Sequence, residues 1–334
     1  MSERTSWLRS ALEWAVGSWW VRLAVSAGLL AVVLTQIDLE AAFDRLKQGH
    51  WGLFAAACGV YLGAFLLGAV RWHAFLDAAG LRRGWWVTLE AYFAGVFAMN
   101  FLPSTFGGDA VRAWLGGGPG ARVKAFSTVL VDRGSILGCA FVVGGIAAAV
   151  DAGDVPVSLV VTLAVAFAVY LIGIAVVASA ALTAARFRHR IPRKLAAFGH
   201  DILPAARAAL SKPRVLGETT ALGLAYEALA VVGIWLVARA VDVHIPFLVL
   251  AVVAPSVLIL SALPISIGGL GVREGSFIAL LDPVGISATD ATLVSLLAAS
   301  AFAIATLPGA AAVLRRPSAG FRQAALQPPS DNSR

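Results

Sequence analysis

The sequence predicts an all-α polytopic membrane protein with about six to eight transmembrane helices, built as an inverted-topology repeat with two re-entrant segments broken by proline and glycine. Three observations support this fold class. Of the 334 residues, 59% are hydrophobic and only 13% are charged. A motif with paired glycines occurs twice, and the charged loops divide into a basic and an acidic set. So high an apolar share is typical of a chain that lies in a bilayer and not of a soluble domain.

Long apolar runs predict the membrane-spanning elements. Most reach or approach the roughly 20 residues that cross about 30 Å of hydrocarbon. The runs are Trp19 to Thr35, Trp51 to Val70, Ile136 to Val150, Pro156 to Leu182, Thr219 to Ala240 and Ala291 to Leu314. Because the third run is short, we expect its helix to begin near Phe126 and to carry Asp132 and Arg133 into the membrane. Tryptophans near the segment ends support these boundaries.

The domain organisation follows from these runs. The first run has no small-residue cleavage site after it and is predicted to be a retained anchor. We expect an N-terminal cytoplasmic segment at 1–18, a single integral membrane domain at 19–316 and a disordered tail at 317–334. Within the membrane domain, the repeat halves lie at about 51–150 and 219–314, and a basic cytoplasmic loop lies at 184–218. The two cysteines lack metal-ligand spacing, so no metal, cofactor or disulfide is expected.

The motif L-P-x-x-x-G-G-x-x-V-R interrupts two apolar regions, at Leu102 to Arg112 and at Leu263 to Arg273. Proline and paired glycines both break helices. Interrupted segments at corresponding positions of two halves are the best sequence pointer to a transporter's substrate site. The motif therefore predicts a functional site inside the membrane.

The charge distribution sets the topology. The net charge is +7, and eight Lys and Arg residues from Arg186 to Arg214 fill one loop, with Arg315, Arg316 and Arg322 in the tail. Positive charge at membrane ends marks the cytoplasmic side. We therefore place that loop and both termini in the cytoplasm, and the acidic loops near Asp38, Asp151 and Asp282 outside. The same distribution argues against nucleic acid as a partner.

Counting membrane crossings suggests how the first motif is arranged. The loop at 82–83 is basic and the loop at 151–154 is acidic, so an odd number of crossings must separate them. If Trp85 to Leu102 enters from the cytoplasm, turns at the motif and returns, only the helix at 126–150 crosses. The number of crossings between the two loops is then one, which is odd as required.

The second motif lies between two outside loops, near Asp242 and Asp282. The segments 247–262 and 269–281 must therefore make zero or two crossings, and a re-entrant pair that enters from the outside fits. One crossing between the halves, at 156–182, would invert the second half relative to the first. Irregular backbone at this depth is tolerated where it lines a wet cavity, so we expect a polar cavity between the halves.

Polar residues inside the apolar segments are candidates for the site, because an ionisable group there costs about 2.5 to 3.5 kcal/mol. Arg112 and Arg273 are the strongest candidates for anion binding, since guanidinium groups match phosphate oxygens and the adjacent glycine N–H groups can approach the same anion. The predicted substrate-binding residues are Arg71, Asn100, Gly107, Gly108, Asp109, Arg112, Asp132, Arg133, Gly268, Gly269, Arg273 and Glu274.

Each assignment has a structural alternative. Arg71 lies just past the expected end of a helix and would then snorkel to the membrane surface. Asp132 and Arg133 are adjacent on one helix, point to different faces and need partners elsewhere. Ion pairing between the halves would explain part of the set, and Glu90 near an interface would be solvated. Glu227 is a further intramembrane carboxyl.

No catalytic motif is found. Gly116 to Gly120 is glycine-rich, but the Gly-Lys-Ser/Thr of a phosphate-binding loop does not follow. The sequence contains neither H-E-x-x-H nor G-x-S-x-G. We therefore expect that the protein is not an enzyme.

The chain resembles the membrane domain of lysylphosphatidylglycerol synthase, a lipid flippase-like family. The resemblance rests on RWHAFL at Arg71, NFLPSTFGGDAVR from Asn100, VDRGSILG from Val131 and LPISIGGLGVREGS from Leu263, and it covers about Trp19 to Leu314. It implies a multi-pass protein of a prokaryotic cytoplasmic membrane, whose relatives move charged or aminoacylated phospholipids between leaflets. The soluble aminoacyl-transferase domain of the full-length synthases is not seen here, so transfer-RNA-dependent lipid modification is not expected.

Three functions follow as expectations. The first is a flippase-like transporter of an anionic phospholipid or polyprenyl-phosphate-type lipid. The alternative is a membrane scaffold, or partner subunit, of a separate lipid-modifying synthase or glycosyltransferase. A membrane-embedded lipid-phosphate enzyme is less favoured. The expected partners are membrane lipids and, for the scaffold, that separate enzyme; a homo-oligomer is left open.

Overall fold

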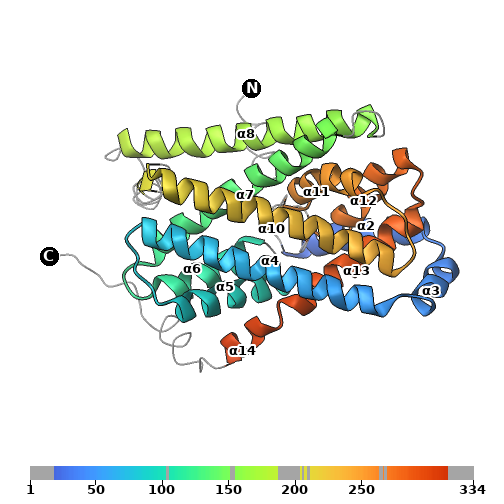
Figure 1. The fold of residues 1–334 in the computed structure, drawn as a ribbon, viewed down its shortest axis with the longest axis horizontal. Coiled ribbons are helices and arrows are strands. Elements are labelled where there is room, and N and C mark those ends of the chain that lie inside the picture. Colours follow the sequence, from blue (N-terminus) through green and yellow to red (C-terminus); the bar gives the residue numbers. More distant parts are fainter. Residues whose placement is uncertain are drawn as a thin grey trace.

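The computed structural model describes residues 19–102, 105–150, 155–186, 211–262 and 269–314, with a few single residues between these ranges. Every regular element in these ranges is a helix (Figure 1), which confirms the predicted all-α class. The predicted cytoplasmic segment 1–18, most of the basic loop 184–218 and the tail 317–334 lie outside the described residues.

Five helices in the described part are long and apolar enough to cross a membrane, or six if one bent pair forms a single span. They are α4 (Trp51–Ala78), α7 (Arg122–Val150), α8 (Val157–Arg186), α10 (Pro213–Ala240) and α13 (Ala288–Ala305). In Figure 1 they run along the long axis of the molecule. The predicted six to eight helices are reached, at the lower end, only when the bent pair counts as one span. The helix expected to start near Phe126 begins slightly earlier, at Arg122, and does carry Asp132 and Arg133.

The bent pair is α2 (Trp19–Thr35) and α3 (Leu39–Lys47), whose axes differ by 83°. Asp38 ends the bend and begins α3, because its carboxylate accepts hydrogen bonds from the backbone N–H groups of Glu40 and Ala41. Figure 1 shows α3 at the right-hand end of the molecule, across the ends of the long helices. The first apolar run is therefore helical as predicted, and it ends in a cap at the end of the helical bundle.

Each motif region folds into a pair of short helices. The first pair is α5 (Trp85–Met99) and α6 (Thr105–Gly117), and the second is α11 (Phe247–Ala262) and α12 (Val272–Leu281). The longest of the four, α11, has 16 residues, so its length of about 24 Å falls short of a 30 Å hydrocarbon layer. The helices of each pair contact one another, and Figure 1 shows the two pairs in opposite halves of the molecule.

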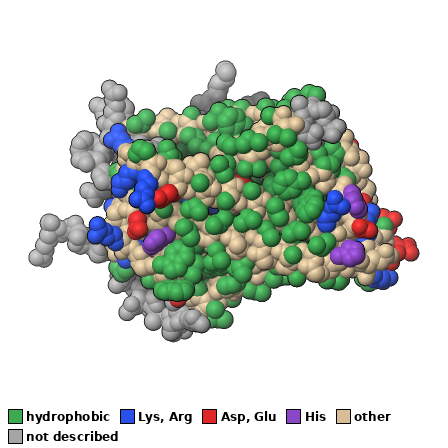
Figure 2. All heavy atoms as spheres, in the orientation of Figure 1, with side chains coloured by type: hydrophobic (Ala, Val, Ile, Leu, Met, Phe, Trp, Pro, Cys, Tyr) green, Lys and Arg blue, Asp and Glu red, His purple; other side chains and the backbone are tan. Residues whose placement is uncertain are grey.

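Contacts at the helix ends show that both pairs return to the end from which they start. Arg83, before α5, donates a hydrogen bond to the carbonyl of Gly117, at the end of α6. At the opposite end, the N–H of His50 donates to the carbonyl of Ala240 at 2.7 Å, and the N–H of Asp38 donates to Thr289 Oγ1 at 2.9 Å. Each pair thus forms a hairpin that returns to its own end of the molecule, as the predicted re-entrant arrangement requires. Figure 2 shows charged side chains gathered at these two ends, with an apolar band between them.

The first helical pair closes because its facing positions are glycines. A Cβ atom added to Gly95 of α5 would lie 2.8 Å from the carbonyl oxygen of Gly108 in α6. The two backbones therefore touch, which only small residues allow. The remaining elements are the 3₁₀ turn η1 (Asp282–Val284) and α14 (Pro308–Leu314). The helix α14 packs against α5, where Gly309 lies against the carbonyl of Phe93.

Candidate functional site

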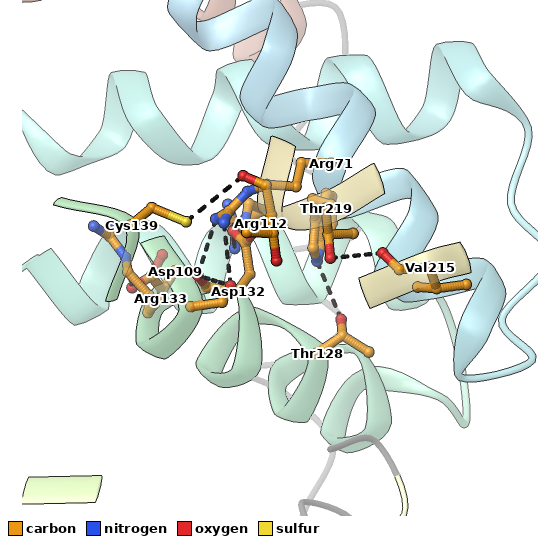
Figure 3. Close-up of polar contacts among 12 residues, drawn as sticks. Arg71, Asp109, Arg112, Thr128, Asp132, Arg133, Cys139, Val215 and Thr219 are labelled. Atoms are coloured by element: carbon orange, nitrogen blue, oxygen red, sulfur yellow. Dashed lines mark hydrogen bonds and ion pairs between the residues drawn. The ribbon is translucent and has the colours of Figure 1, made fainter. Parts of the chain in front are cut away.

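An ionic cluster joins α4, α6 and α7 in the half of the molecule that holds the first motif (Figure 3). Its centre is the carboxylate of Asp132. One oxygen, Oδ1, lies 2.5 Å from Arg71 Nη2, and the other, Oδ2, lies 2.7 Å from Arg112 Nη2. Arg71 also donates to the backbone carbonyl of Asp132 at 2.9 Å and to Ser135 Oγ at 3.1 Å. One carboxylate thus pairs with two arginines from two other helices, and these three side chains together carry one net positive charge.

Arg133, the neighbour of Asp132, forms a separate pair. Its Nε donates to Asp109 Oδ2 of α6 at 2.9 Å, and its Nη2 contacts Met99 Sδ at 3.1 Å. Asp132 and Arg133 therefore point to different faces of α7 and find partners on other helices, as their adjacency predicts. The side chain of Arg133 is 34% exposed, whereas those of Arg71, Arg112 and Asp132 are at most 5% exposed.

Aromatic side chains cover the buried part of the cluster. The guanidinium of Arg112 lies 4.7 Å from the ring centroid of Trp72 and 5.1 Å from that of Tyr92. Trp72 is held in place by a 3.1 Å hydrogen bond from its Nε1 to Thr128 Oγ1. Such ring faces attract a cation and exclude water from it. Arg112 is therefore sequestered, which the sequence analysis did not anticipate for its leading anion-binding candidate.

The structure rules out the alternative role proposed for Arg71, which was snorkelling from just past the end of a helix. The helix α4 continues to Ala78, so Arg71 lies inside the helix and not past its end. Its side chain is 2% exposed and ion-paired, so it does not snorkel to the surface. The hydropathy of the sequence drops after Val70, but the pairing with Asp132 allows the helix to continue through this charge.

The glycine pair of the first motif also differs from expectation. Gly107 and Gly108 do not form the turn; they lie in the first turn of α6, and the break precedes them. Backbone N–H groups at the very start of a helix lack acceptors within it, and binding of an anion at these two glycines stays a prediction. At the break, Asn100 Nδ2 donates to Thr306 Oγ1 at 2.9 Å, which ties this turn to the junction of α13 and α14.

A second ionic cluster lies at the start of α12. Glu274 is fully buried and accepts hydrogen bonds from the N–H of Gly271 at 2.7 Å and from Arg273 Nη2 at 2.5 Å. Ser295 of α13 lies between the two, with its Oγ 3.2 Å from Arg273 Nε and 3.3 Å from Glu274 Oε1. The side chain of Arg273 is 24% exposed. Like Arg133, Arg273 is partly exposed to solvent and lies beside a buried carboxylate.

The turn before α12 does depend on glycine. Gly269 and Gly271 have φ angles of 77° and 81°, a region that side chains rarely adopt. Gly268 lies outside the described residues. Arg273 is thus the second residue of α12, whereas Arg112 lies well inside α6. The two motif copies match in sequence but place their arginines differently.

Several contributors were missed by the sequence analysis. Ser135, Ser295 and Trp72 hold or cover the charged groups, and only Trp72 carried a signal, its position next to Arg71. Glu227 of α10, which the sequence did single out, is 6% exposed and lies one turn after Gly223, where an added Cβ would lie 3.2 Å from Arg71 Nη1. No group of three or more His, Cys, Asp and Glu side chains among the described residues is placed to hold a metal ion.

Comparison with known proteins agrees with this architecture. The model of the family described as the lysylphosphatidylglycerol synthase TM region matches residues 19–309. A UPF0104 membrane protein of Pyrococcus horikoshii is 26% identical over 115 residues, which make up 33% of this chain and 34% of that protein. A UPF0104 membrane protein of Archaeoglobus fulgidus is 27% identical over 115 residues, 34% of this chain and 35% of that protein.

The matched segments thus span about a third of each archaeal relative. The family model, in contrast, covers both motif copies and all the residues of both ionic clusters. This chain therefore belongs to the family of the lysylphosphatidylglycerol synthase transmembrane region.

Proposed function

We propose that the protein is a flippase-like transporter that moves an anionic phospholipid or a polyprenyl-phosphate-type lipid between the leaflets of a prokaryotic cytoplasmic membrane. The observation that carries this proposal is the pairing of each short-helix hairpin with one partly exposed arginine. Arg133 lies beside the first hairpin and Arg273 within the second, and the hairpins enter from opposite ends.

The geometry suits a charged headgroup that must pass an apolar layer. A guanidinium has five N–H donors, and the ion pair of Arg133 uses its Nε, while Arg273 directs Nε and one Nη to Glu274. Apart from Arg133 Nη2, which contacts Met99 Sδ, the remaining donors are available to bind phosphate oxygens. The buried carboxylates Asp109 and Glu274 orient the arginines and balance their charge when no lipid is bound.

The main anion-binding role therefore falls to Arg133 and not to Arg112. Arg112 is buried beneath Trp72 and bound to Asp132, so it supports the site from behind. Arg273 keeps the role predicted from its motif. No catalytic step is proposed, and a separate lipid-modifying enzyme would supply or consume the transported lipid.

The test is flipping of fluorescent lipid in vesicles that contain only the purified protein. Fluorophore-labelled phosphatidylglycerol is incorporated in both leaflets, and dithionite added outside then bleaches the lipid that reaches the outer leaflet. The double variants Asp109→Asn/Arg133→Gln and Arg273→Gln/Glu274→Gln remove both charges of a pair, so that neither leaves an unpaired buried charge. Each should slow flipping at least about tenfold, because a hydrogen bond to a charged group contributes about 1.5 to 3 kcal/mol.

Lys47→Ala is the matched control, since Lys47 is an exposed cation in an ion pair at the end of the molecule. It should flip lipid like the wild type, and all variants should melt as cooperatively as the wild type. Wild-type rates in both double variants would refute the transport role of these arginines. No flipping by the wild-type protein alone would favour the scaffold function, and a modified lipid product would favour an enzyme.

A further inference from the structure

A second candidate site lies at the end of the molecule where α4 begins and α10 ends. It is a pocket of about 360 Å³ lined by His50, Leu53, Trp235, Leu236, Arg239 and Asp242. The 2.7 Å hydrogen bond from the N–H of His50 to the carbonyl of Ala240 fixes its two walls. This pocket is distinct from both ionic clusters and shares no residue with them.

Arg239 stands out among the described cations at this end. Arg45 is paired with Asp290 at 2.7 Å and Lys47 with Asp44 at 3.1 Å. No ion pair joins Arg239 to any carboxylate that the structure describes, and its Nε is buried without a hydrogen-bond partner in that part of the chain. Its guanidinium lies 5.2 Å from the ring centroid of Trp235, one turn earlier on α10.

Capping of α10 does not explain this arginine. A cation near a helix C-terminus commonly binds the last carbonyl groups. Here those carbonyls have other donors: Ala238 accepts from the N–H of Val243 at 2.9 Å and Ala240 accepts from His50. Beyond the helix, Arg45 Nη1 donates to the carbonyls of Val241 and Asp242, each at 3.3 Å. The Arg239 guanidinium is therefore available to bind another ligand.

The lining indicates what that ligand is. Leu53, Trp235 and Leu236 make one side of the pocket apolar, and the pocket lies where the apolar band meets a charged end, the depth of lipid headgroups. Arg239 supplies a cation and Asp242 an anion, and neither takes part in an ion pair among the described residues. A ligand with both charges and an apolar body complements all three features.

We propose that this pocket binds a zwitterionic phospholipid whose headgroup carries a phosphate and a primary ammonium group, as in phosphatidylethanolamine. Arg239 donates hydrogen bonds to the phosphate, Asp242 accepts them from the ammonium group, and Trp235 with the two leucines contacts the glycerol and first acyl carbons. Such a lipid differs in charge from the anionic lipid of the proposed transport. The site is thus a separate binding site of the leaflet at this end.

Native mass spectrometry of the purified full-length chain in detergent tests this proposal. Short-chain phosphatidylethanolamine, phosphatidylglycerol and phosphatidylcholine are titrated separately, with inorganic phosphate as the free-anion probe. Wild-type protein should bind phosphatidylethanolamine most tightly, because the trimethylammonium of phosphatidylcholine has no N–H to donate. Arg239→Gln should weaken binding at least about tenfold, and Arg239→Lys should retain most of it. Asp242→Asn should abolish the preference for phosphatidylethanolamine.

Lys47→Ala again serves as the matched control, since it removes one exposed cation at the same end and should leave lipid binding unchanged. Tight phosphatidylethanolamine binding by Arg239→Gln would overturn the proposal. So would equal binding of inorganic phosphate, which would mark an adventitious anion site. A preference that survives in Asp242→Asn would overturn the role of the ammonium group.

Discussion

Arg71 of α4 and Asp132 of α7 form an ion pair with 2.5 Å between Nη2 and Oδ1, although each lies within a membrane-spanning helix and is nearly inaccessible to solvent. The same carboxylate holds Arg112 at 2.7 Å. Three helices are therefore joined by one acidic side chain. Removing one partner of a buried pair is far more costly than forming the pair is favourable.

Asp132→Asn should accordingly lower the free energy of unfolding by about 3 to 5 kcal/mol, because Arg71 and Arg112 would stay buried without a counter-charge. Denaturant-induced unfolding in detergent micelles measures this change. The matched control is Asp44→Asn, which removes a carboxylate from an exposed pair with Lys47 and should cost less than about 1 kcal/mol. Equal effects of the two substitutions would show that the Asp132 cluster is not a structural centre.

Gly108→Ala should destabilise the first hairpin. The added methyl group would collide with the Met99 side chain and the carbonyl of Gly95, and such overpacking costs roughly 1 to 3 kcal/mol. The control is Gly59→Ala in α4, where no atom lies within 4 Å of an added Cβ. Because alanine favours helix by up to about 1 kcal/mol over glycine, this variant should be as stable as the wild type or more so. Thermal melting in micelles compares the two.

Cysteine labelling should locate both ends of each hairpin. In a background without Cys58 and Cys139, single cysteines at Arg82 and Pro119 flank the first hairpin, and His244 and Asp282 flank the second; all four positions are exposed. A membrane-impermeant maleimide should label the first two from one side of the membrane and the last two from the other. Labelling of positions 82 and 119 from opposite sides would instead mean that the first hairpin region contributes an odd number of crossings.

The long helices could be predicted because their signal is local. Apolar runs gave α4, α7, α8 and α10 to within a few residues at most ends, since the bilayer requires a continuous apolar stretch. Two ends differ by more: α10 begins at Pro213 and not at Thr219, and α4, predicted to end at Val70, ends at Ala78. Helix propensity and hydropathy predict that the helix ends at Arg71. Only the ion pair with Asp132, which is distant in sequence, makes a continuous helix favourable.

The site could be predicted as a set of residues but not as a set of contacts. Helical periodicity correctly separated Asp132 from Arg133, because adjacent residues point to different faces. It could not tell which neighbouring helix each face meets. The first pair of glycines was misjudged for a similar reason: glycine serves both turns and close helix contacts. Gly108 serves a close helix contact, whereas Gly269 of the second pair serves a turn.

The helix α13 has a mechanical consequence for the whole molecule. Its middle holds the second hairpin through Ser295, and the turn after its last residue holds the first hairpin through Thr306 and Asn100. The helix α13 therefore contacts both hairpins, which start from opposite ends of the molecule. Because a helix is stiff along its axis, a displacement of α13 would shift the Ser295 and Thr306 contacts in the same direction. One hairpin would then move toward its own end of the molecule while the other moved away from its end.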